Sequence, residues 1–120
     1  MDNYYVSKLI PLMAEARLGV VANPLINITL QGRHDTYPRR RGMTRVPELM
    51  SAGLTVAFGH DCVMDPWYPM GVGDPLQAAF VLAHYGQMSG AKEMPYLLEM
   101  ITTNPAKALG VDAKGIRAGG

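Results

Sequence analysis

Residues 54–61 read Leu54-Thr55-Val56-Ala57-Phe58-Gly59-His60-Asp61. The first five are apolar or β-branched, which is the composition of a short strand buried on both faces. The run ends at a glycine and passes directly into a histidine and an aspartate. In parallel α/β barrels the catalytic side chains project from the C-terminal ends of the strands. The sequence therefore predicts a buried strand with a candidate site at its exit.

Asp61 is the candidate in this stretch for a metal ligand or for a general acid and base. The alternative is an aspartate that caps a turn, because Asp is common after strands for local hydrogen-bonding reasons. His60 precedes it, but consecutive residues of an extended chain point to opposite sides. We therefore assign His60 a packing or supporting role rather than a place in the same pocket.

A second buried strand is predicted at residues 19–22, and it follows a helix predicted at residues 3–17. Gly19 is the expected C-cap of that helix. Pro11 leaves two alternatives, a helix that starts near Ser7 or one that is kinked at the proline. Asn23-Pro24 indicates a loop, and residues 25–44 are predicted to form one long connection, a kind that is often functional.

Helices are predicted in the rest of the chain from capping and proline signals. A short helix at residues 46–52 ends at Gly53. Asp74-Pro75 starts another, with Asp74 as N-cap and Gln77 able to close a capping box. The expected buried residues of this helix are Leu76, Ala79, Phe80 and Ala83. Further helices are predicted at residues 93–102 and, after Asn104-Pro105, at residues 106–109, with Gly110 as C-cap.

This order of elements predicts an α/β protein built from repeating units of a parallel sheet or barrel. A sheet of only two buried strands leaves two open edges, which a complete domain rarely tolerates. We therefore expect partner strands outside this chain.

Composition limits the classes of partner. The chain has 48% hydrophobic and 18% charged residues and a formal net charge of +1, which favours a small-molecule ligand over nucleic acid or a membrane surface. No signal peptide or membrane-spanning segment is evident. Residues 39–41 are three arginines, and we interpret them as a solvated loop face. The single cysteine, Cys62, agrees with a reducing compartment, so a cytoplasmic location is expected.

Two further features bear on the site. His34 and His84 complete the histidines, and no H-x-H or H-x-x-x-H spacing places two imidazoles on one metal ion. Asp65-Pro66-Trp67-Tyr68-Pro69 holds the only tryptophan in a stiff loop just beyond the strand. The ring of Trp67 could wall a pocket for a flat ligand or pack in the core.

Four motifs together resemble the bacterial cytosine deaminases of the amidohydrolase superfamily. They are residues 23–28, residues 30–38, Gly59-His60-Asp61 with the following 65–69 loop, and residues 103–110. The resemblance covers nearly the whole chain. It implies the C-terminal portion of a metal-dependent (β/α)8 TIM barrel over residues 1–118, with residues 19–22 as strand seven and residues 54–58 as strand eight. Residues 119–120 would begin the return to a small β-sandwich domain.

The resemblance also implies the chemistry. Asp61 would bind one divalent metal ion, zinc or iron, through one oxygen and handle the proton of the metal-bound water with the other. The reaction would be hydrolysis of the C–N bond of a cyclic amidine in pyrimidine salvage, with release of ammonia. The histidines and glutamate that complete the family's site are absent from this sequence. We therefore expect this chain alone to be inactive and to bind metal weakly or not at all.

Cys62 departs from the family pattern, which has a second acidic residue there. Together with Pro66 and Trp67 it is predicted to border the substrate. A small, soft thiol makes the pocket roomier and less polar, which favours 5-methylcytosine or another 5-substituted cytosine alongside cytosine. A nucleophilic role for Cys62 is disfavoured because no adjacent base is evident.

Two other functions remain open. The chain could be a non-catalytic truncated module that acts by self-association or partner binding, and its exposed strands favour a homo-oligomer in either case. A different aminated heterocycle or a cyclic amide could also be the substrate.

Overall fold

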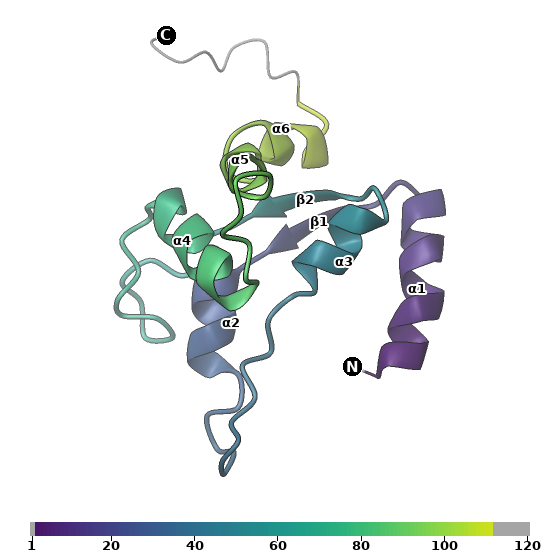
Figure 1. Ribbon diagram of the computed structural model, residues 1–120. Coiled ribbons are helices and arrows are strands. Elements are labelled where there is room, and N and C mark those ends of the chain that lie inside the picture. Colours follow the sequence, from purple (N-terminus) through teal and green to yellow (C-terminus); the bar gives the residue numbers. More distant parts are fainter. Residues whose placement is uncertain (1, 112–120) are drawn as a thin grey trace, which may run out of the picture.

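The structure, a computed structural model, describes residues 2–111. Figure 1 shows helices arranged around a pair of strands. In chain order the elements are α1 (Asn3–Glu15), β1 (Gly19–Ala22), α2 (Pro24–Leu30), α3 (Val46–Ser51), β2 (Thr55–Phe58), α4 (Pro75–Tyr85), α5 (Met94–Glu99) and α6 (Thr103–Ala108). The predicted α/β class is confirmed, while the predicted segment 119–120 lies outside the described residues.

The two strands run parallel, with Gly19 opposite Thr55 and Ala22 opposite Phe58. A parallel pair needs a crossover connection, which α2, the 31–45 segment and α3 provide. Because the strands are parallel and in register, their C-terminal ends lie side by side. The residues that follow each strand, Asn23 and Gly59, are therefore brought to the same edge.

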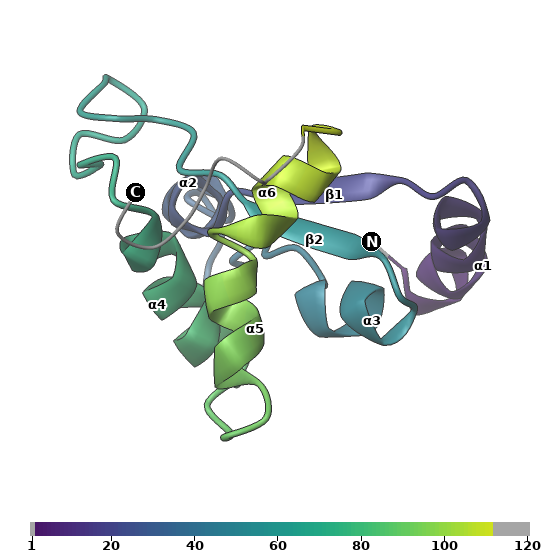
Figure 2. The same ribbon diagram turned by 90° about the horizontal axis from the view of Figure 1, so that it is seen from above.

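The core is formed by side chains from β2 and the helices around it. Val56, Leu82 and Met100 are at most 1% exposed. The short helix α6 lies over both strands, as Figure 2 shows from above. Its Ala108 comes so close to β1 that a Cβ on Gly19 would lie 3.2 Å from that of Ala108. This cover buries β2, whereas β1, which was predicted as a buried strand, is exposed at Gly19 and Val21.

The outer edge of β2 is partly satisfied by helical segments instead of a strand. The amide N–H of Phe58 donates to the carbonyl of Met100 at 2.8 Å, and Nδ2 of Asn104 donates to the carbonyl of Val56 at 2.8 Å. Among the described residues, β1 has only β2 as a strand neighbour. The expectation of an open sheet edge therefore holds for β1, whereas groups at the α5–α6 junction cover part of the edge of β2.

The clearest correction concerns residues 25–44, predicted as one loop. Residues 24–30 form α2, with Pro24 at its first position and Leu25 and Ile26 buried. Pro24 was interpreted as a loop signal, yet a proline in the first turn loses no helical hydrogen bond and has a suitable φ. Burial of the next two apolar side chains stabilises the helix.

The first helix starts where it was predicted to start, but it ends earlier than predicted. It starts at Asn3 after the N-cap Asp2, runs through Pro11 and ends at Glu15. The residue with the left-handed backbone after it is Arg17, at φ 53°, and Gly19 already belongs to β1. The prediction of Gly19 as C-cap was therefore wrong.

The N-cap of α4 was predicted correctly, but its buried face was predicted only in part, with Ala79 right and Leu76 and Phe80 wrong. Oδ1 of Asp74 accepts a hydrogen bond from the Leu76 amide at 2.9 Å. Leu76 and Phe80 are 56% and 65% exposed, while Ala78, Ala79 and Leu82 are buried. Since apolar residues occur all around this helix, periodicity alone could not select the face that packs.

Of the two C-terminal helices, the first is shorter than predicted and the second starts earlier than predicted. The 93–102 segment is helical only at Met94–Glu99, and Asn104 lies inside α6 instead of capping it. Gly110 follows the C-cap Leu109 with φ +66°, as its predicted capping role requires. Within residues 2–111 no helix combines the length and apolar character needed to cross a bilayer.

Candidate active site at the strand ends

The two strand ends are joined by a hydrogen bond between side chains. Asn23 follows β1 and Asp61 lies three residues beyond β2. Nδ2 of Asn23 donates to Oδ2 of Asp61 at 3.1 Å, which links positions 38 residues apart in the chain. The parallel register therefore places Asp61 beside a polar partner that the sequence analysis did not identify.

Gly59 permits this close approach. A Cβ on Gly59 would overlap Oδ1 of Asn23 and lie 3.2 Å from Cγ1 of Val21. Only a residue without a side chain fits between the ends of the two strands. The glycine that marks the end of the apolar run is thus a packing requirement of the site.

Asp61 is exposed and has a left-handed backbone conformation, with φ 69°. Aspartate tolerates this region better than most residues, and non-glycine residues there are concentrated at functional sites. Its Oδ1 accepts a hydrogen bond from Sγ of Cys62 at 3.2 Å. Each carboxylate oxygen therefore has one donor, an amide at Oδ2 and a thiol at Oδ1.

His60 forms hydrogen bonds to the loop that follows the strand. Its Nε2 accepts the Gly73 amide hydrogen at 3.2 Å, so that nitrogen carries no proton. The ring proton is consequently on Nδ1, which donates to the carbonyl of Cys62 at 2.9 Å. Both ring nitrogens are used, in agreement with the supporting role predicted for His60.

The Cys62 thiol is held in its protonated form. Its hydrogen bond to the Asp61 carboxylate, then burial, then the Asp65 carboxylate raise the pKa of Cys62 from 9.0 to about 12. The thiolate is the nucleophilic form of cysteine, so this environment opposes a nucleophilic role. The structure therefore supports the prediction that Cys62 is not a nucleophile.

Asp65 organises the turn that carries the tryptophan. Its Oδ1 accepts the backbone N–H groups of Trp67 and Tyr68, each at 2.9 Å. The Tyr68 amide is the main cause of a lowered pKa for the Asp65 carboxyl. Tyr68 is buried, while Pro66 is exposed and Trp67 is 66% exposed. Trp67 is therefore not part of the core that the described residues form.

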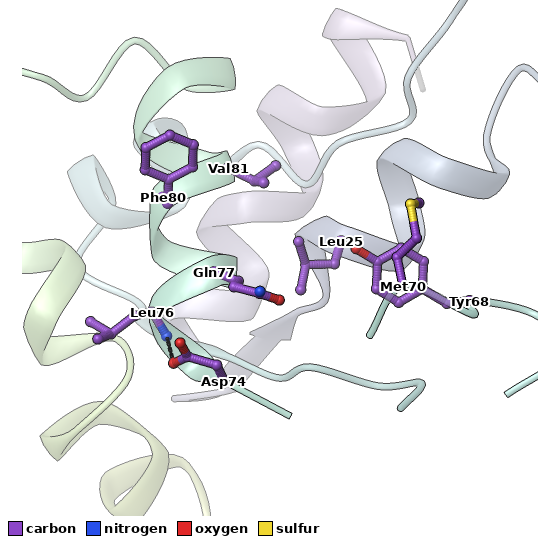
Figure 3. A pocket seen from close by; sticks show the side chains of 8 residues that line it. All are labelled: Leu25, Tyr68, Met70, Asp74, Leu76, Gln77, Phe80 and Val81. Atoms are coloured by element: carbon purple, nitrogen blue, oxygen red, sulfur yellow. Dashed lines mark hydrogen bonds between the residues drawn. The ribbon is translucent and has the colours of Figure 1, made fainter. Parts of the chain in front are cut away.

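A hollow of about 520 Å³ lies beside this loop, between α2 and α4. Figure 3 shows the side chain of Gln77 pointing toward Leu25 across it. Its lining residues are Leu25, Tyr68, Met70, Asp74, Leu76, Gln77, Phe80 and Val81. Asp61, Cys62 and Trp67 do not line it, so this hollow is distinct from the candidate site.

The remaining histidines lie outside the strand-end cluster. His84 is exposed on α4, where Nδ1 lies 2.8 Å from the Phe80 carbonyl, and His34 is exposed in the 31–45 segment. In residues 2–111 no three His, Cys, Asp or Glu side chains are grouped so that they could hold a metal ion. A complete metal site that included Asp61 would therefore need ligands from outside these residues.

The arginine-rich segment is tied to its own loop. Arg40 forms a two-pronged ion pair with Asp35, with both N–O distances 2.7 Å. This contact lowers the pKa of Asp35 from 3.8 to about 2. Arg39 lies over the Tyr37 ring, and Nη1 of Arg41 donates to the Arg40 carbonyl. These contacts agree with the interpretation of the arginines as a solvated loop face.

The sequence as a whole matches a known family. A sequence model described as the amidohydrolase family matches residues 1–120. The chain belongs to the amidohydrolase family. The family that the sequence motifs predicted by resemblance is therefore confirmed.

Similar amidohydrolases include deaminases of heterocyclic compounds. The chain is 34% identical over 113 residues to a pterin deaminase from Rhizobium rhizogenes, an alignment that covers 91% of this chain and 25% of the relative. It is 29% identical over 75 residues to N-isopropylammelide isopropyl amidohydrolase from a Pseudomonas species, covering 62% of this chain and 19% of that protein.

Solved structures show the same similarity. Crystal structures of 5-methylcytosine deaminase from Klebsiella pneumoniae, with 5-fluorocytosine and with phosphonocytosine, each match with a TM-score of 0.86 and 41% identity. The matches cover 91% of this chain and 26% and 27% of those chains. The chain therefore spans about a quarter of the length of the pterin deaminase and of the 5-methylcytosine deaminase.

Proposed function

We propose that this amidohydrolase chain is part of a metal-dependent hydrolytic deaminase acting on cytosine or a 5-substituted cytosine. The observation that carries the proposal is Asp61, placed just beyond the end of a parallel strand in a chain 41% identical to a 5-methylcytosine deaminase. We further propose that β1 and β2 are strands seven and eight of a (β/α)8 barrel.

Asp61 is the residue proposed to serve both metal binding and proton transfer. A carboxylate is a suitable ligand for zinc or iron, and this one is exposed instead of being enclosed by an ion pair. A bound metal ion would supply a nucleophile by lowering the pKa of its water. The carboxylate of Asp61 is suited to receive a proton and deliver it to the leaving amine.

The loop after β2 is proposed to contact the base. Trp67 is exposed on a turn that Asp65 holds rigid, so its ring is available to a flat ligand. Pro66 stiffens the same turn. Cys62 carries a neutral thiol next to Asp61, and a small apolar group there leaves room for a 5-methyl substituent.

A cytoplasmic location and association through β1 are also part of the proposal. A single free cysteine is compatible with a reducing compartment such as the cytoplasm. The free edge of β1 and the exposed Val21 on it favour association, either with further strands or with another subunit.

The test is ammonia release by the full-length protein encoded by the gene, loaded with zinc or ferrous iron. Cytosine, 5-methylcytosine and pterin are compared as substrates. We expect the two pyrimidines to be deaminated, and Asp61→Asn to lower kcat/KM by about 100-fold or more. Asp35→Asn is a matched control, since it changes a carboxylate that is paired with Arg40 in its own loop and is not proposed to act in the site.

Three outcomes would contradict the proposal. Deamination of pterin alone would assign the chain to the other substrate class represented among its relatives. Full activity of Asp61→Asn would show that the reaction does not need the Asp61 carboxylate. Absence of any deamination, together with stable association of the chain with itself or a partner, would favour the non-catalytic module.

A further inference from the structure

We propose that Asn23 is a positioning residue for Asp61. Its side-chain amide holds one oxygen of the carboxylate so that the other is presented to the metal ion. This inference rests on the proposed function of Asp61 and adds a residue on a different strand to the site.

The first argument is that the Asn23 side chain does not perform its expected local role. Asn23 occupies the N-cap position of α2, where an asparagine ordinarily accepts a hydrogen bond from an amide of the first turn. No such bond is present, and φ −114° and ψ 73° differ from the usual extended cap. The amide group is directed instead to Oδ2 of Asp61.

The second argument is that the side chain of Asn23 is fixed in place. Its Oδ1 packs so closely against Gly59 that a Cβ there would overlap it. The register of β1 and β2 holds the two backbones on which these residues lie, and the Gly59 amide donates to the Ala22 carbonyl at 3.0 Å. A donor on such a rigid base can hold a carboxylate in a defined orientation.

The third argument is that Asp61 needs an external support. It is exposed and lies in a left-handed turn, so its own backbone surroundings do not confine its side chain. Its other donor is the Cys62 thiol at 3.2 Å, and a thiol is a weak hydrogen-bond donor. Oδ1 is therefore the oxygen that can exchange its partner, while the stronger amide donor keeps Oδ2 in place.

The test compares two asparagines that both donate to β2 or to the segment after it. Asn23 donates to Asp61, and Asn104 donates to the Val56 carbonyl within the strand. Asn23→Leu and Asn104→Leu remove the donor at similar side-chain volume, in the full-length protein. The readouts are the zinc affinity of the metal-free protein, measured by competition with a chromophoric chelator, and kcat, KM and the midpoint of thermal unfolding.

We expect Asn23→Leu to weaken zinc binding and to lower kcat by about 10- to 100-fold, the usual effect of losing a partner that orients a metal ligand. KM should change little, because Asn23 is not proposed to touch the substrate. Asn104→Leu should lower the unfolding midpoint and leave zinc affinity unchanged. If either leucine variant does not fold, Asn23→Ser and Asn104→Ser are compared instead, since serine is shorter and fits both sites.

Asp61→Asn separates a failure of this inference from a failure of the proposed function. If Asp61→Asn abolishes zinc binding and activity while the Asn23 variants keep both, the positioning role is wrong and the proposed function stands. Equal loss of zinc affinity in the Asn23 and Asn104 variants would also overturn the inference, since the effect would then be one of general stability. If Asp61→Asn has no effect, the proposed function itself fails.

Discussion

Gly59 and Asn23 are in contact at the C-terminal ends of two parallel strands, so closely that a single methyl group on Gly59 would overlap Oδ1 of the asparagine. This contact limits how closely the C-terminal ends of β1 and β2 can approach each other. It also explains why an apolar strand must end in glycine before the carboxylate of Asp61.

Gly59→Ala should therefore disturb the site through Asn23. We expect a loss of about 1–3 kcal/mol in the free energy of unfolding, typical of adding a methyl group to a filled space. Activity should fall as in Asn23→Leu, because the amide must move away from Asp61. Denaturant unfolding and steady-state kinetics of the full-length protein measure the two effects.

The double variant Gly59→Ala/Asn23→Ser is the control. Serine is shorter, so it should relieve the overlap and recover part of the lost stability, giving a non-additive double-mutant cycle. If the losses in the free energy of unfolding of the two single variants simply add in the double variant, the overlap with Asn23 is not the cause of the instability of Gly59→Ala.

Trp67→Ala should raise KM without affecting stability. The ring is 66% exposed, so its removal should change the free energy of unfolding by no more than about 0.5 kcal/mol. Loss of an aromatic contact with the base should raise KM by about 2- to 10-fold. Tyr96→Ala, which removes a 47% exposed ring from α5, should leave KM unchanged. An unchanged KM in Trp67→Ala would exclude this ring from substrate binding.

Cys62→Asp should shift the choice of base. A charged, hydrated carboxylate in place of the neutral thiol should lower kcat/KM for 5-methylcytosine relative to cytosine by about 10-fold or more, the scale for one methyl group in a fitted pocket. Competition between the two bases in one reaction measures the ratio directly. Cys62→Ser, which keeps the side chain small, is the control. A wild-type preference for cytosine with a ratio that Cys62→Asp leaves unchanged would contradict the assignment.

The stabilisation that the ion pair of Asp35 and Arg40 contributes to the folded state should depend on pH in the acid range. The Arg40 guanidinium lowers the pKa of Asp35 from 3.8 to about 2, so the folded state favours the ionised carboxylate. The stabilisation is therefore fully present above the ordinary value of 3.8 and is lost as the pH falls through about 2. Since Arg40 is largely exposed, the effect on global stability is small.

A double-mutant cycle with Asp35→Asn and Arg40→Gln measures this coupling by denaturant unfolding at about pH 5 and at the lowest pH at which the protein remains folded. We expect the coupling to weaken toward acid. A coupling that is independent of pH, or that grows as the pH falls, would show that the pair does not hold Asp35 in its ionised form.

Much of the local structure could be predicted because its causes lie close together in the chain. The apolar run ending at Phe58 and the cap at Asp74 were identified from residues within a few positions of each other. The position of Asp61 beyond a strand end followed from the first of these. The four motifs, taken together, also sufficed to identify the family.

The failures have a common cause in packing. The helix α2 was missed because Pro24 marks a turn and a helix start equally well, and burial of Leu25 and Ile26 decided between them. The exposure of Phe80 was missed because α4 is apolar on every side, so its neighbours select the buried face.

The sequence by itself determined the α/β class, the family and the carboxylate at position 61, since these depend on residue type and local order. Only the tertiary structure decided that Asn23 is the partner of that carboxylate. The two residues follow different strands and are separated by a crossover, so their contact depends on parallel register and on the space left by Gly59. The register and the fit at Gly59 cannot be deduced from local sequence. A shift of one residue in the pairing of the strands would turn every side chain of one strand to the other face, and the sequence of each strand would be the same in both cases.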